Sequence, residues 1–220
     1  MVRLLALVSW MATAAPQLPG QQTSGLATRL DQATYAALRP ILEAAGRDSI
    51  PLRPLEAKAL EGTAKRRPAA QIVAAVQRLA QELQQARLLL RQAAPTAPHA
   101  EGDIVAAAEA IRRGVPAEEV AALRRRVPPA TSLEIPLAVL GELVQRGVPA
   151  AEARAVIEHM VNSGVPQARM VEIPSHVDVA LRVGAPPITA LGSALQSLGI
   201  PVPPPGPGGL GPRRPPGDRG

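Results

Sequence analysis

The three histidines, and the serine and aspartate beside one of them, are the residues whose chemistry would be easiest to recognise. His159 follows Glu158, but no second histidine stands three or four residues away, so the helical spacing of a zinc protease is missing. Ser175, His176 and Asp178 are the residue types of a catalytic triad, but a triad is a spatial arrangement and no nucleophile elbow surrounds Ser175. His99 lies in a proline-rich stretch. We therefore predict no catalytic, cofactor-binding or metal-binding residue, and we expect a protein that is not an enzyme.

Short arginine clusters are the remaining groups that could bind a ligand, which would be an anion. Seven residues are candidates: Arg66, Arg67, Arg112, Arg113, Arg124, Arg125 and Arg126. Each cluster follows a predicted helix, and acidic residues such as Asp103 and Glu118 stand at predicted helix starts. Charges placed this way complement the helix dipole, by roughly 0.3–1 kcal/mol each. We favour this structural role, with a patch for phosphates or lipid headgroups as the alternative.

The overall charge limits the partners. The chain has a net charge of +6. Removal of a leader over 1–14 takes away Arg3, and residues 201–220 carry +2, which leaves about +3 on the helical part. That excess is too mild for a dedicated nucleic-acid binder, and Tyr35 would be the only ring available to stack on bases. We expect no sequence-specific nucleic-acid binding, and a protein as the partner.

The N-terminus has the pattern of a cleaved export signal. Arg3 precedes an apolar run from Leu4 to Ala12, and Ala12-Thr13-Ala14 supplies the small residues that a signal peptidase reads. The run is too short to span a bilayer, which takes about 20 apolar residues. No later segment is long and apolar enough either. We predict a signal peptide over 1–14 and a periplasmic or secreted protein, and the excess of arginine and alanine suggests a bacterium with GC-rich DNA.

The elements that follow are predicted to be helices separated by proline and glycine. After a linker over 15–27, helical pattern begins near Leu26–Tyr35 and runs, with a kink at Pro40, to about Asp48, and a short helix ends at 65–67. A longer helix follows Pro68. Its apolar residues step by four and three, as on one packed face of a helical bundle: Ile72, Val76, Leu79, Leu83, Ala86 and Leu90. Residues 94–100 form a break and a possible boundary within the helical domain, 28–200.

Beyond this break a Gly-x-Pro phrase recurs five times. The glycines are Gly114, Gly147, Gly164, Gly184 and Gly199. Glycine readily adopts the left-handed conformation just past a helix end, and proline suits the first helical position, where no intrahelical partner for an N–H is needed. Each phrase therefore ends one helix, and the first four also start the next. Val127-Pro128-Pro129 adds another break, after which either Ser132 caps the next helix or Pro136 starts it.

These patterns predict an all-α fold of short helices in stacked helical hairpins, as a repeat-like bundle or a small α-solenoid. The last segment, 201–220, holds 8 prolines and 6 glycines, so we expect a disordered tail. The favoured function is an exported interaction or assembly module of the cell envelope. The alternative is a weak binder of anionic envelope polymers or lipid headgroups. The oligomeric state is not encoded in any pattern that we recognise.

Overall fold

The computed structural model describes residues 24–201, and the regular secondary structure of this part of the chain consists of helices alone, without strands. The prediction of an all-α fold is confirmed. The predicted signal peptide, most of the linker, and the tail beyond Pro201 lie outside the described residues. The helices are α1 (Ser24–Ala27), α2 (Gln32–Arg47), α3 (Leu52–Ala64), α4 (Ala69–Ala93), α5 (Glu101–Arg112), α6 (Ala117–Arg126), α7 (Glu134–Gln145), α8 (Ala150–Asn162), α9 (Gln167–Arg182) and α10 (Pro187–Ser197).

The first helix starts earlier than the sequence suggests. We predicted a linker up to residue 27, but Ser24–Ala27 form one helical turn. Leu26 and Leu30 are buried in the core, which gives this segment an apolar anchor that its polar composition hides. Pro40, where the sequence suggested a kink, lies inside α2, which runs as one helix from Gln32 to Arg47.

The Gly-x-Pro phrases end helices as predicted. All five glycines have a positive φ, from +63° at Gly199 to +98° at Gly114. At Gly147 the glycine N–H donates to the Val144 carbonyl at 2.9 Å, and the Val148 N–H donates to the Leu143 carbonyl at 3.1 Å. This pair of hydrogen bonds is the Schellman motif, which satisfies carbonyls that the helix end leaves free.

The prolines of these phrases stand one residue earlier than predicted. Pro116, Pro149 and Pro166 are N-caps with ψ near 138°, and each helix starts at the next residue. The cap position is extended, while its carbonyl already accepts the first helical hydrogen bond. A missing N–H is as harmless there as at the first helical position. Only Pro187, after the cap Pro186, occupies a first position.

Two further joints have the same geometry without glycine. Ser49 and Arg66 have φ values of +53° and +52°. The Ile50 N–H donates to the Ala45 carbonyl at 2.8 Å, and the Arg67 N–H donates to the Gly62 carbonyl at 3.0 Å. Pro51 and Pro68 follow as N-caps. The Gly-x-Pro phrase is therefore one version of a joint that the chain also builds with serine and arginine.

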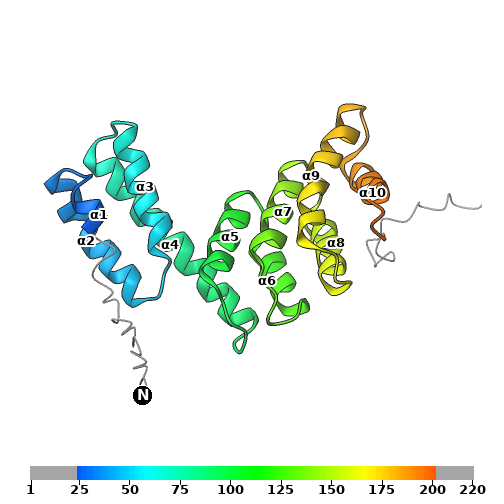
Figure 1. Ribbon diagram of the computed structural model, residues 1–220, viewed down its shortest axis with the longest axis horizontal. Coiled ribbons are helices and arrows are strands. Elements are labelled where there is room, and N and C mark those ends of the chain that lie inside the picture. The colour runs from blue at the N-terminus through cyan, green and yellow to red at the C-terminus, as the bar shows by residue number, and fades with distance from the viewer. Residues whose placement is uncertain (1–23, 202–220) are drawn as a thin grey trace, which may run out of the picture.

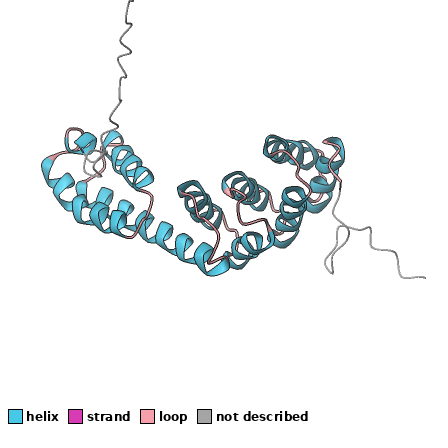
Figure 2. Ribbon diagram, turned by 60° about the horizontal axis from the view of Figure 1, so that its bottom comes forward, coloured by secondary structure: helices cyan, strands magenta, loops and turns pink. Residues whose placement is uncertain are grey.

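The long helix α4 connects two groups of helices (Figure 1). Helices α2 and α3 pack against it on one side of the molecule, and α5 and α6 on the other. Beyond it α5, α7 and α9 lie in one row, α6 and α8 in a second, and α10 packs on α9. Figure 2 shows that the described residues form a crescent, with α4 at its base.

The core consists of aliphatic side chains. It extends as one cluster from Leu26 to Ile200 and continues on both sides of the break at 94–100. Five of the six apolar residues predicted to line one face of α4 are buried, and Leu79 is half-buried against the core. The prediction of a packed bundle face is confirmed.

The start of α7 differs from both alternatives, because its N-cap is Leu133, one residue after Ser132. The helix begins at Glu134, whose N–H donates to the Ser132 Oγ at 3.3 Å, and Pro136 is its third residue. A second cap comes from a distant helix, because the Leu133 N–H donates to the Asp103 carboxylate of α5 at 2.7 Å.

Candidate functional site

The arginine clusters stand at helix ends, and glutamates of the fold partner several of them. Arg112 and Arg113 both bond to Glu109, with Arg113 Nε at 2.7 Å from its carboxylate, and these hydrogen bonds lower the pKa of Glu109 despite its partial burial. Arg126 lies 3.6 Å from Glu158. Three of the seven candidate residues therefore have an acidic partner within the fold.

Arg124 is not at the surface. Its side chain is 1% exposed, and its guanidinium donates to the carbonyls of Pro128 at 2.6 Å, Thr131 at 3.1 Å and Val127 at 3.4 Å. Burial lowers the pKa of Arg124, an effect that the charge of Asp103 opposes. Arg124 holds the loop between α6 and α7, so it is removed from the candidate anion-binding residues.

The exposed arginines do not gather on one surface. The clusters of Arg112 and of Arg125 stand at the two ends of α6, because α6 begins directly after the α5 joint. Ten residues separate these ends by about 15 Å at 1.5 Å per residue. Arg66 and Arg67 belong to the other group of helices, across α4. The structure brings none of the three clusters together.

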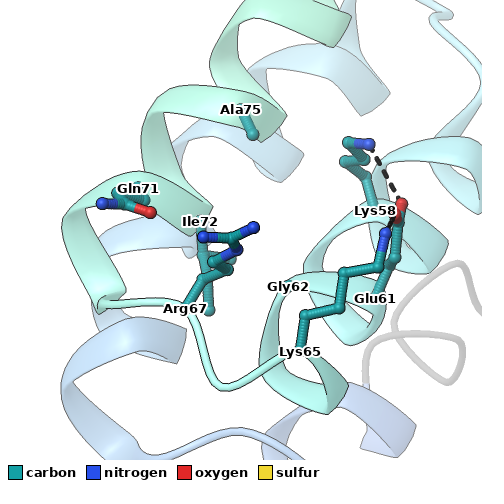
Figure 3. A pocket seen from close by; sticks show the side chains of 8 residues that line it. All are labelled: Lys58, Glu61, Gly62, Lys65, Arg67, Gln71, Ile72 and Ala75. Carbon is teal, nitrogen blue, oxygen red and sulfur yellow. Dashed lines mark hydrogen bonds and ion pairs between the residues drawn. The ribbon is translucent and has the colours of Figure 1, made fainter.

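A hollow of about 250 Å³ with a basic lining lies at the α3–α4 joint, beside one of the predicted clusters (Figure 3). Gly62, Ile72 and Ala75 form its apolar part. Its charged lining is Lys58, Glu61, Lys65 and Arg67, with Gln71 beside them. Figure 3 shows Arg67 across the hollow from the lysines and Glu61. The sequence analysis named Arg67 as a candidate anion-binding residue but did not name Lys58, which stands seven residues before Lys65, the C-cap of α3.

Glu61 partly neutralises this hollow. Its carboxylate accepts hydrogen bonds from Lys65 and from Lys58, the latter at 3.0 Å. These bonds, with that of Lys65 the stronger, lower the pKa of Glu61 to about 2. Glu61 is therefore charged at every pH above about 3, and the lining of the hollow keeps an excess of two positive charges.

Exposed apolar side chains follow one face of α9 up to its C-cap, and another stands at the start of α10. Val171 and Val179 are 56% and 57% exposed, Val183 is 81% exposed, and Ile188 is 37% exposed. The three valines, with Ser175 between the first two, recur every four residues, so they follow one face of α9. The opposite face carries Met170, Ile173, Pro174 and Val177, which are buried. We call this exposed set the valine stripe.

The triad residue types near His176 are not assembled. The Ser175 hydroxyl donates to the Glu172 carbonyl at 2.7 Å, and Asp178 accepts two hydrogen bonds from Arg146 at 2.8 and 2.9 Å. These bonds lower the pKa of Asp178. His176 instead lies 2.9 Å from the Ser197 hydroxyl of α10. Serine and carboxylate thus both have other partners.

Two general features of the described residues complete the description. No group of three or more His, Asp or Glu side chains between residues 24 and 201 has the geometry to hold a metal ion. In the same range no helix combines the length and apolar character needed to cross a membrane. No protein-family model, curated protein or solved structure matches the chain, so its function has to be argued from its own residues.

Proposed function

We propose that this chain is an exported, non-enzymatic helical module that binds another protein in the bacterial cell envelope. The valine stripe of α9 and α10 carries this proposal. Single exposed apolar side chains are normal on a protein surface, whereas several aligned on one face are typical of an interface. Four such residues within two adjacent helices support a docking surface for a partner.

The arrangement of the helices supports the same function. Pairs such as α5 with α6 and α7 with α8 are joined by tight turns, and successive pairs pack on their neighbours. We interpret them as stacked hairpins of a small α-solenoid. Such arrays bind through an extended surface rather than through a deep cleft. The crescent of Figure 2 offers a surface of this kind.

The test of this function compares two sets of charge substitutions in the full chain. Val171→Asp with Val183→Asp places two carboxylates on the stripe. Gln196→Asp places one on an exposed position of α10 outside it. We expect proteins that co-purify with the parent from its host to be lost with the stripe variant and kept with the control. Equal co-purification with all three chains, each verified as folded by circular dichroism, would contradict the proposal.

Export is part of the proposal and has its own test. Cleavage after Ala14 predicts that the chain recovered from its host begins near Ala15. A cytoplasmic chain that retains Met1 would refute export without bearing on the valine stripe.

The α3–α4 hollow favours a second function, the weak binding of anionic envelope polymers or lipid headgroups. Its two excess positive charges are the observation behind this alternative. Binding to vesicles rich in phosphatidylglycerol should then be weak, should vanish at moderate salt, and should fall further with Arg67→Gln. Arg125→Gln is the matched control, because Arg125 is exposed but lies away from the hollow. Equal losses with both variants would exclude the hollow as the binding surface.

A further inference from the structure

A larger pocket lies where the two groups of helices meet over α4. Its volume is about 470 Å³, within the range of roughly 300–1,000 Å³ typical of small-molecule sites. One wall comes from the end of α2 and the start of α3, around Ile50. The other comes from the C-terminal half of α4, the following loop and the first turn of α5. None of the predicted site residues lines it.

Two arginines give this pocket a cationic wall. Arg87 and Arg91 stand one turn apart on α4, and neither forms an ion pair with an acidic residue of the described chain. Arginine side chains in proteins are always protonated, and their planar fork of donors matches a carboxylate. These two guanidinium groups therefore have donors available for an anion that enters the pocket.

His99 and Glu101 complete the polar lining. The Nε2 of His99 lies 3.1 Å from the Ala94 carbonyl, which can only accept, so the ring hydrogen is on that nitrogen. Its Nδ1 is buried and has no partner within the described chain. Glu101 contributes one negative charge. Arg87, Arg91 and Glu101 together give the lining a net charge of +1, which one monovalent anion would balance.

The rest of the pocket is apolar. Ile50, Ala97 and Ile104 are at most 7% exposed, and Leu52 packs against the core beside them. Ser49 also lines the pocket. It is the left-handed residue of its helix joint, a position that glycine occupies in five of the seven joints. The buried aliphatic residues form an apolar floor beneath the polar lining, which the aliphatic part of a small acid can contact and a fully hydrated inorganic ion cannot use.

We propose that this pocket binds an organic monocarboxylate with a small apolar body. Arg87 and Arg91 bind the carboxylate, and the aliphatic part of the acid lies against the apolar floor around Ile50 and Ile104. The ligand is a free short-chain acid or the C-terminal residue of a peptide, which present the same chemistry. The proposal goes beyond the docking function and does not depend on the valine stripe.

Calorimetric titration of the full chain tests the proposal with five probes. These are hexanoate, hexanol, inorganic phosphate and acetyl-Ala-Leu, the last as free acid and as amide. We expect at least one of the two carboxylates to bind, and its neutral counterpart to bind at least tenfold more weakly. Hexanoate alone would identify a small acid, and the free-acid peptide alone a C-terminal residue; either result supports the site.

Three variants of α4 assign the binding to this pocket. Arg87→Gln and Arg91→Gln should each weaken carboxylate binding by about tenfold, which corresponds to about 1.4 kcal/mol, because each removes one charge-assisted hydrogen bond. Arg78→Gln, an exposed arginine of the same helix outside the pocket, should leave the affinity unchanged. Binding of neither carboxylate, equal affinity for hexanol, equal affinity for phosphate, or equal effects of all three variants would each overturn the proposal.

Discussion

Gly164 allows the strain of a helix joint to be measured almost alone. Its φ is +70°, and a Cβ built on it would meet nothing within 4 Å. Gly164→Ala therefore adds no steric contact with the rest of the fold. Any loss of stability comes from forcing an L-residue into the left-handed conformation, about 1–2 kcal/mol. Alanine also lowers the conformational entropy of the unfolded chain, which stabilises the folded protein by roughly 0.4–1 kcal/mol and offsets part of this loss. We expect a net destabilisation of about 1 kcal/mol.

Gly192 is the matched control, because it lies inside α10 with ordinary backbone angles. A Cβ there would also meet nothing within 4 Å. Glycine inside a helix is worse than alanine by about 0.5–1 kcal/mol, so Gly192→Ala should stabilise the protein by that amount. The same chemical change is thus expected to have opposite signs at two positions. Urea melts of both variants and the parent would measure the free energies of unfolding.

The opposite result at Gly164 would refute the reasoning. If Gly164→Ala stabilised the chain as Gly192→Ala is expected to do, the helix would continue through the joint, and the left-handed conformation of Gly164 would be refuted. Gly147→Val adds a second check, because its Cβ would also lie 3.4 Å from Pro187. We expect a loss of about 2 kcal/mol or more there. Pro149→Ala should cost less, since proline at a cap only presets φ.

Three further predictions concern charged residues. Arg66→Gly should stabilise the protein by about 0.5–1 kcal/mol in urea melts, because glycine relieves the left-handed strain at a joint that lacks it; a loss would mean that the Arg66 side chain stabilises the fold. Arg124→Gln should destabilise by about 3 kcal/mol because three backbone carbonyls of the α6–α7 loop lose a buried charged donor, whereas Arg125→Gln at the exposed neighbour should change stability by less than about 0.5 kcal/mol. Similar effects of the two variants would show that Arg124 is not buried. The pKa of the Glu61 carboxyl is about 2 in the folded chain, against an ordinary value of 4.5, so its ionised form should stabilise the fold above pH 4.5 and lose that contribution as the pH falls toward 2. An NMR titration of the parent in which the Glu61 carboxyl titrates near pH 4.5 would contradict its hydrogen bonds with the lysines.

The fold could be predicted from the sequence because its joints are local. Gly147 and Pro149 have backbone preferences that hold in any context, so their recurrence located helix ends correctly. The left-handed conformation of Ser49 and Arg66 could not be predicted, because residues with a Cβ disfavour it and only tertiary packing imposes it. The exposed face of α9 could not be recognised either. Val171 and Val177 are the same residue type within one helix, and only their neighbours decide which is buried.

The site could be predicted only in part. Arg124 and Arg125 are adjacent in a basic run, but a loop that wraps over α6 buries the first and leaves the second at the surface. The pocket over α4 combines Ser49, Arg87 and His99 from three different segments of the chain, so no residue spacing in the sequence predicts it. Long-range packing, which short patterns do not encode, creates both features.

Site-specific crosslinking from the valine stripe tests the proposed function most directly. A photoreactive residue in place of Val179, in the full chain expressed in its host, would capture whatever covers the stripe. The same residue in place of Gln85, an exposed position of α4, is the control. The proposal predicts a small set of discrete adducts from Val179, identified by mass spectrometry and absent from Gln85. The same adducts from both positions, or none from Val179, would contradict it.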